Sequence, residues 1–279
     1  MRLTLKEHFR RGSRFLLDPA FRRTSLERRR IERLPRFTPS LTSLLGRPFE
    51  IVDSLSFLEM YEDIWEREAY RFPASRDKPV ILDGGANVGL GVAYFKKIYP
   101  NSEIIAFEPD ARIFPVLKRN VEAWGLQGVT LVSRALWWEE TDLPFLVEGS
   151  YGGRIARERD AAAGSVRTAR LRNYLDRRID LLKLDIEEGE TEVLEDSADM
   201  LGCVTHLFVE YHGALDRPQT LHRLLSLLTG AGFRLNLQAM RDSPRPFMTR
   251  KLNMGNDLQV EIYAFRETPR PESRNHDPV

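Results

Sequence analysis

The chain has 279 residues, enough for one large domain or for one domain with an appendage. Hydrophobic residues make up 42% of it, which suffices for a globular core, and the single cysteine, Cys203, excludes a disulfide framework and a cysteine-based zinc site. The net charge is +1, and no stretch approaches the run of about 18 apolar residues that a membrane span requires.

Residues 1–47 form a basic segment, with 13 Lys and Arg against 4 Asp and Glu in residues 1–48. Apolar residues among the arginines predict a helical arm that packs on the body or joins a second subunit into a homo-oligomer. Peripheral contact with a membrane of anionic lipid, or with a polyanionic substrate carrier, is the alternative. No nucleic-acid motif accompanies the charge. The segment lacks the apolar core of a secretory signal, so we expect a cytoplasmic protein.

Residues 48–72 precede the first strand of the expected core. Asp53 and Ser54 are typical of a helix start, with apolar residues at helical spacing after them. Tyr70 stands just before the first core strand, where it either contacts a ligand at the strand's carboxyl end or belongs to ordinary packing.

Residues 79–110 hold the most informative pattern. A short apolar strand at 80–82 runs into a glycine-rich turn at 83–89, a helix follows to about 99, and a second strand at 104–107 ends in an acid. Open α/β sheets bind ligands at the carboxyl ends of such strands, and an acid after the second strand accepts hydrogen bonds from ribose hydroxyls. The pattern therefore indicates nucleoside binding.

The turn is not the dinucleotide fingerprint, because Asn87 and Leu90 stand where that fingerprint requires glycine. Asp83 would repel a pyrophosphate but suits the sulfonium of S-adenosylmethionine, which we expect as cofactor; NAD and a ligand-free structural turn are the alternatives. The expected cofactor-binding residues here are Asp83, Gly84, Gly85, Ala86, Asn87, Gly89, Glu108 and Pro109.

Residues 129–133 predict a third strand, whose end flanks the adenine in sheets of this type. Position alone makes Ser133 and Ala135 candidates for that pocket. Residues 145–148 and 166–171 are candidates for two extra strands, and the loop between them is expected to form part of a substrate wall.

Acids cluster again after two later strands. Asp185 and Glu187 follow the strand at 180–186, and the next strand, 206–212, ends in Glu210 and His212. If the two strands are neighbours, these four side chains converge at the edge that holds the cofactor. Like charges crowded in this way need a shared proton, cation or donor. The alternative is acids that merely cap helices.

The remaining sequence predicts an apolar helix at 221–228 and two last strands at 233–240 and 258–265, joined by a basic loop. The expected organisation is a basic helical arm at 1–47, one domain at 48–267 and a disordered tail at 268–279.

Four ordered motifs, VILDGGANVG, IIAFEPD, LLKLDIEEGE and VEYHG, resemble the FkbM family of class I S-adenosylmethionine-dependent methyltransferases. The resemblance implies an α/β fold, a Rossmann-like seven-stranded sheet whose last strand is antiparallel, here with an N-terminal helical extension. It also implies transfer of a methyl group to a hydroxyl of a sugar, glycan or secondary metabolite. The family's Glu-Gly-x-Glu reads Glu187-Glu188-Gly189-Glu190 here, which leaves open which glutamate points into the site.

For the chemistry, we expect His212 as general base, oriented by Glu210, with Asp185 as the third catalytic residue. The alternative is a divalent cation such as Mg²⁺, held by Asp185, Glu187 and Glu210. Two other classes of function remain: a non-catalytic S-adenosylmethionine-binding protein and an NAD-dependent oxidoreductase. The acceptor, whether small molecule, lipid-linked glycan, polyketide or peptide, is not encoded in these patterns.

Overall fold

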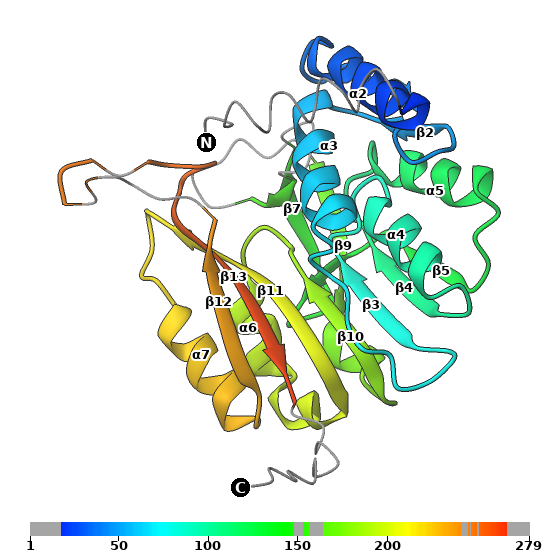
Figure 1. The fold of residues 1–279 in the computed structure, drawn as a ribbon. Coiled ribbons are helices and arrows are strands. Elements are labelled where there is room, and N and C mark those ends of the chain that lie inside the picture. Colours follow the sequence, from blue (N-terminus) through cyan, green and yellow to red (C-terminus); the bar gives the residue numbers. More distant parts are fainter. Residues whose placement is uncertain are drawn as a thin grey trace, which may run out of the picture.

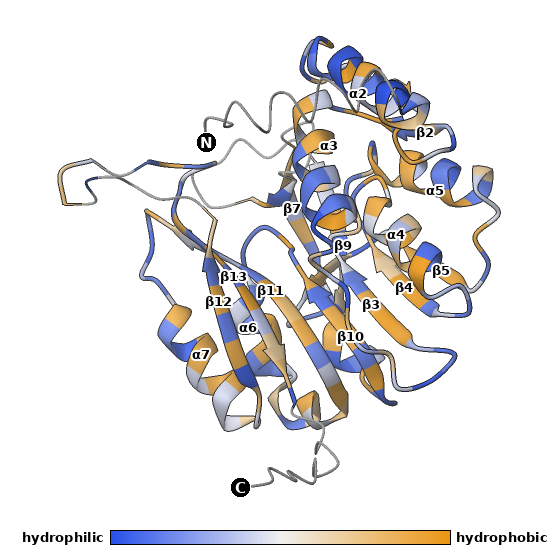
Figure 2. Ribbon diagram, viewed as in Figure 1, coloured by the Kyte–Doolittle hydropathy of each residue, from blue (hydrophilic) through white to orange (hydrophobic). Residues whose placement is uncertain are grey.

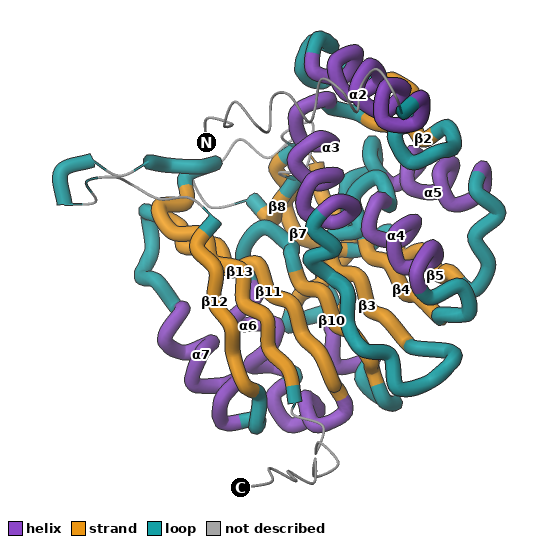
Figure 3. Tube along the Cα trace, viewed as in Figure 1, coloured by secondary structure: helices purple, strands orange, loops and turns teal. Residues whose placement is uncertain are grey.

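A computed structural model describes residues 18–147, 153–156, 164–240, 245, 247–249 and 251–266. Seven strands form the central sheet, in the order β12-β13-β11-β10-β3-β4-β5 (Figures 1 and 3). Their bounds are β3 Val80–Gly84, β4 Glu103–Phe107, β5 Val129–Val132, β10 Ile179–Leu184, β11 Val204–Ala214, β12 Arg234–Ala239 and β13 Asn256–Phe265. Strand β13 lies between β11 and β12 and runs antiparallel to both, while β5, β4, β3, β10 and β11 are parallel. The predicted seven-stranded sheet with an antiparallel last strand is confirmed.

The inner strands are buried on both faces, which explains their nearly continuous apolar sequences (Figure 2). Each face of the sheet carries a hydrophobic core. Because successive side chains of a strand point to opposite faces, Ile81 and Leu181 belong to one core, and Leu82 and Leu182 belong to the other. The first core holds the helices α3 Ser54–Met60, α4 Leu90–Ile98 and α5 Phe114–Ala123, and the second holds α6 Glu190–Asp196 and α7 Leu221–Gly230. Helices therefore cover both faces of the sheet (Figure 1).

The insertion between β5 and β10 forms a second sheet of order β6-β9-β7-β8. Its strands are β6 Ala135–Trp137, β7 Asp142–Leu146, β8 Arg154–Ile155 and β9 Gly164–Arg170, followed by the 3₁₀-helix η2 Leu171–Tyr174. The two predicted extra strands correspond to β7 and β9. The short strands β6 and β8 were missed because two or three residues carry no readable alternation. Between β10 and β11 the chain forms α6 and then the 3₁₀-helix η3 Ala198–Cys203.

The described part of the basic arm packs on the body. Helix α2 Pro19–Glu32 buries Ile31 completely, and Arg28 reaches Glu62 and Glu66, each at 3.2 Å, on the π-helix η1 Tyr61–Glu66 that continues α3. A hairpin, β1 Ser40–Thr42 with β2 Phe49–Ile51, completes this extension. Its roles toward a membrane or a second subunit stay predictions.

Residues 1–17 and the predicted tail at 268–279 lie outside the described residues, as does most of residues 241–250. In the part of the chain that the structure covers, no helix has the length and apolar content to cross a bilayer.

Candidate active site

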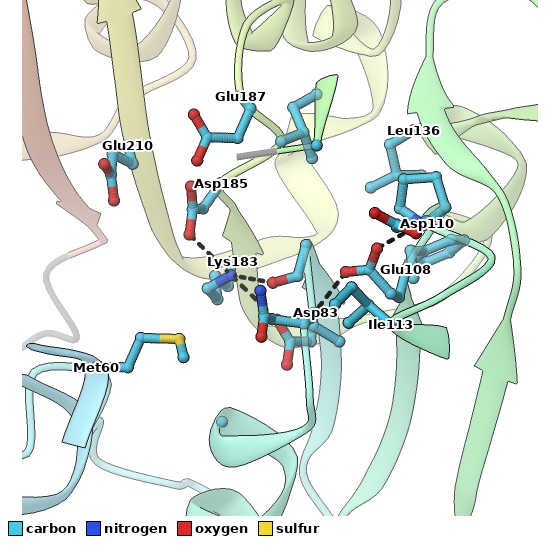
Figure 4. Close-up of a pocket in the computed structure, with 18 of the residues that line it drawn as sticks. Met60, Asp83, Glu108, Asp110, Ile113, Leu136, Lys183, Asp185, Glu187 and Glu210 are labelled. Carbon is cyan, nitrogen blue, oxygen red and sulfur yellow. Dashed lines mark hydrogen bonds and ion pairs between the residues drawn. The ribbon is translucent and has the colours of Figure 1, made fainter. Parts of the chain in front are cut away.

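A cavity opens where β3, β4, β10 and β11 end, at the carboxyl edge of the parallel strands (Figure 4). One wall consists of Arg134, strand β6, Phe145 of β7 and Ile155 of β8, and residues from α3, η1 and β13 form the other. Of the residues predicted from the sequence, the lining includes Tyr70, Asp83, Gly85, Ala86, Asn87, Glu108, Pro109, Ala135, Asp185, Glu187 and Glu210.

Asp83, the last residue but one of β3, is 1% exposed, yet neither of its carboxylate oxygens receives a hydrogen bond from the described residues. Its nearest cation is Lys183, whose Nζ lies 3.4 Å from Oδ1. Burial raises the pKa of Asp83, and Lys183 opposes that rise. A buried carboxylate with open acceptor sites is costly unless a ligand supplies donors or positive charge.

Lys183 holds the ends of β3 and β10 together. Its Nζ donates to the carbonyl oxygens of Gly84 at 3.1 Å and Gly85 at 2.9 Å, and lies 3.3 Å from Asp185 Oδ2. Burial lowers the pKa of this amine, but Asp185 and Asp83 outweigh it and raise the pKa overall. The ammonium thus places Asp83 and Asp185 on the same side of the cavity.

Glu108 follows β4 and faces the same cavity from the next strand (Figure 4). It accepts hydrogen bonds from the backbone N–H groups of Asn87 at 3.0 Å and Asp110 at 2.8 Å. Burial raises its pKa to about 7, partly offset by these two donors. Asn87, with φ of +51°, aims its N–H at Glu108 from the glycine-rich turn.

The two residues predicted to flank the adenine, Ser133 and Ala135, lie in different surroundings. Ala135 is 7% exposed and lines the cavity, together with Leu136 and Arg134. Ser133 is exposed and is not among the lining residues. Gly84 and Gly89 are also set back from the cavity: Gly84 packs against Leu136, and Gly89 is the N-cap residue of α4 at φ +89°.

Tyr70 forms part of the wall between the cavity and the sheet. Its ring packs edge-on against Phe208 at 4.8 Å between centroids, and Lys183 Nζ lies 5.9 Å from the ring centre. Burial raises the pKa of its hydroxyl well above the ordinary value. Tyr70 therefore packs in the core and also borders the cavity, and its contact with a ligand stays a prediction.

The structure brings together the acids that follow β10 and β11. Asp185, Glu187 and Glu210 face one space at the open end of the cavity (Figure 4). His212 lies behind them with a fully buried side chain, and its Nε2 is 3.3 Å from both Glu187 Oε2 and Glu210 Oε1. His212 itself does not line the cavity.

Glu190, at the start of α6, fixes the histidine ring: its Oε1 lies 2.9 Å from His212 Nδ1. Burial lowers the pKa of His212, but Glu187 and Glu190 outweigh it and raise the pKa well above its ordinary value. Burial also raises the pKa of Glu187 to about 8 and raises that of Glu210. Glu190 thus holds His212 at Nδ1, and Glu210, which the sequence predicted to orient the ring, lies 3.3 Å from its Nε2.

The backbone shows which glutamate of the Glu-Gly-x-Glu pattern points into the site. Glu187, Glu188 and Gly189 all have positive φ, of 58°, 90° and 91°. Glu187 lines the cavity, whereas Glu188 turns to Arg154 at 3.7 Å and Arg217 at 3.3 Å. Glu188 therefore has a backbone conformation that glycine favours, and Glu187 is the glutamate of this pair that points into the site.

Sequence reasoning missed the residues that close the cavity from the other side: Met60, Asp63, Gln259 and Glu261. Glu261 pairs with Glu210 in the register of β13 on β11. An antiparallel pairing across about 50 residues of chain leaves no local signal in the sequence.

The strand order, the antiparallel β13 and a cavity at the strand ends define a class I methyltransferase fold. Residues 83–235, more than half of the chain, match the Methyltransferase FkbM domain, and the chain belongs to this family. It is a methyltransferase.

Two similar proteins are also named methyltransferases. Methyltransferase sdnD of Sordaria araneosa is 29% identical over 195 residues, 57% of this chain and 75% of that protein. Methyltransferase 1 of Beauveria bassiana is 25% identical over 161 residues, 48% of this chain and 65% of that protein. The crystal structure of methyltransferase FkbM from Methylobacillus flagellatus is similar in fold, with a TM-score of 0.51 at 13% identity over 91% of this chain and 60% of that one.

Proposed function

We propose that the protein is an S-adenosylmethionine-dependent O-methyltransferase that acts on a hydroxyl of a sugar, glycan or secondary metabolite. The observation that carries the proposal is the pair of buried acids at the carboxyl ends of adjacent strands, Asp83 and Glu108, which line one cavity. Asp83 has unsatisfied acceptor oxygens among the described residues, and S-adenosylmethionine brings the matching groups: an ammonium, a sulfonium and a ribose diol.

The lining residues fit the cofactor part by part. Glu108 would accept from the ribose hydroxyls, and Asp83 with Asp185 would face the cationic groups. The slot between Ile113, Ala135 and other apolar residues would take the adenine. When bound, the cofactor supplies an electrophilic methyl group.

The chain's own residues then have two tasks. They must hold the acceptor hydroxyl in line with the methyl group, because positioning can contribute several kcal/mol. They must also take the hydroxyl proton as the new C–O bond forms and the sulfur leaves as a thioether. Glu210 faces the cavity and is placed to receive that proton, whereas His212 lies behind it. We therefore assign the base to Glu210 and give His212, our first choice from the sequence, a supporting position.

Isothermal calorimetry on the full-length chain tests the cofactor. S-Adenosylmethionine and S-adenosylhomocysteine should bind, NAD should not, and Glu108→Ala should weaken binding at least about tenfold. Glu103→Gln is the matched control: Glu103 lies at the other end of the same strand, exposed and paired with Arg177. NAD binding, or no binding of either adenosyl compound, would overturn the proposal. Transfer of labelled methyl groups to base-stable ethers would identify O-methylation among candidate acceptors.

A further inference from the structure

The space between Glu187, Glu210 and His212 brings three electron-pair donors together. Glu190 Oε1 lies 2.9 Å from His212 Nδ1 and accepts its N–H, so a metal ion that displaces the proton from the other nitrogen would meet the lone pair of Nε2. That Nε2 is 3.3 Å from Glu187 Oε2 and 3.3 Å from Glu210 Oε1. Three acceptors facing one another repel unless a proton or a metal ion stands among them.

A shared proton does not fit this geometry well. The side chain of His212 is fully buried, yet its Nε2 makes no hydrogen bond with any described residue, although both carboxylates are near enough. The ligands of one metal ion also lie close together without hydrogen bonds between them, because each ligand atom points at the ion and not at the neighbouring ligand. One atom each from Asp185, Glu187 and His212 lie within 4.8 Å of one another, and ligands at about 2.0–2.6 Å from an ion are separated by at most roughly 4–5 Å.

We propose that Asp185, Glu187 and His212 bind one divalent metal ion of the Mn²⁺ or Zn²⁺ type. The imidazole nitrogen distinguishes this site from the all-oxygen set expected from the sequence, and favours a first-row transition ion over Mg²⁺. Glu190 is the outer carboxylate that fixes the histidine tautomer, as in carboxylate–histidine–metal triads.

This site deepens the proposed function and occupies the acceptor side of the same cavity. When bound, the ion would polarise the acceptor hydroxyl, and Glu210, beside the ligand set, would take its proton. The oxygen's electron pair would form the bond to the methyl carbon, and the carbon–sulfur pair would leave with the thioether. Lys183 keeps one oxygen of Asp185 engaged at 3.3 Å, so the other is available for the metal.

Mn²⁺ titration of the tag-free full-length chain, with free Mn²⁺ followed by electron paramagnetic resonance, tests the site directly. One ion per chain is expected. His212→Ala and Glu187→Gln should each weaken binding at least about 100-fold, and Glu190→Gln about 10–100-fold. His222→Ala is the control: His222 is exposed on α7, and Mn²⁺ affinity should not change.

Calorimetric binding of S-adenosylhomocysteine by each variant shows that its fold is intact. A wild-type chain that binds this compound but not Mn²⁺ would overturn the metal site and leave the proposed function standing. Unchanged Mn²⁺ affinity in both His212→Ala and Glu187→Gln would also overturn it. Mn²⁺ binding without any binding of the adenosyl compounds would support the metal site and refute the proposed cofactor.

Discussion

The carbonyl oxygen of Asp185 stands 1.8 Å from the place where a β-carbon on Gly85 would lie. The glycine-rich turn after β3 and the acidic turn after β10 thus meet backbone to backbone, with Lys183 donating to the carbonyls of Gly84 and Gly85 beside the contact. Position 85 needs glycine for two reasons, this approach and its φ of +80°. The same contact sets the distance between the cofactor side and the acceptor side of the cavity.

Gly85→Ala should therefore destabilise the fold and abolish cofactor binding. The clash with backbone forces β3 and β10 apart, and we expect a loss of at least about 3 kcal/mol in the free energy of unfolding. Gly46→Ala isolates the backbone contribution, because Gly46 has nearly the same φ, +81°, with open space around it. That control should cost only about 1 kcal/mol in urea denaturation. Equal losses in the two variants would contradict the close approach as the cause.

Glu108 gives the cofactor site a pH dependence. Its raised pKa, about 7, means that the free protein takes up a proton there as the pH falls below neutrality. A carboxylate accepts from two ribose hydroxyls and a carboxylic acid does so poorly, so affinity should be highest above pH 7. The dissociation constant of S-adenosylhomocysteine should then rise up to about tenfold per unit below it.

Calorimetry between pH 5.5 and 8.5, compared between wild type and Glu108→Gln, isolates this contribution. The variant should bind more weakly at pH 8 and show a flatter profile below pH 7. Parallel profiles in the two proteins would assign the pH dependence to another group.

Larger side chains at positions 133 and 135 would show which of the two residues contacts the adenine. Ala135 lines the cavity, so Ala135→Leu should occupy part of the slot and weaken S-adenosylhomocysteine binding at least about tenfold. Ser133 is exposed outside it, and Ser133→Leu should leave affinity unchanged. A tenfold loss in the Ser133 variant instead would place the adenine on the outer side of the loop.

What the sequence could predict depended on how local each signal is. The strand, glycine turn, helix and acid of residues 79–110 lie within one βαβ unit, so residue spacing alone was enough to assign Asp83 and Glu108 to one ligand site. Alternation and strand ends likewise brought Asp185 and Glu210 together. The hydrogen bond from His212 to Glu190 could not be predicted, because it depends on three successive positive φ angles at residues 187–189.

Asp53 ties the N-terminal extension to the start of α3. Its buried carboxylate accepts from Ser56 N at 3.0 Å as the helix N-cap, and from Arg36 Nε and Phe37 N at 2.7 Å each. Burial raises the pKa of Asp53, but the bonds to Arg36 and Ser56 outweigh it and lower the pKa to about 2. Asp53→Ala should cost about 1–2 kcal/mol in urea denaturation at pH 7.

The sign of the pH dependence follows from this depressed pKa. An aspartate titrates near pH 3.9 in the unfolded chain and near 2 in the folded one, so its contribution is fully present above about pH 4 and is lost as the pH falls toward 2. The gap in stability between wild type and Asp53→Asn should narrow as the pH is lowered from 5 to 3. Asp142→Asn removes an exposed ion pair with Arg167 and should shift stability by less than about 0.5 kcal/mol. A gap that widens on acidification would mean that Asp53 is held protonated in the folded chain, which its four hydrogen-bond donors do not allow.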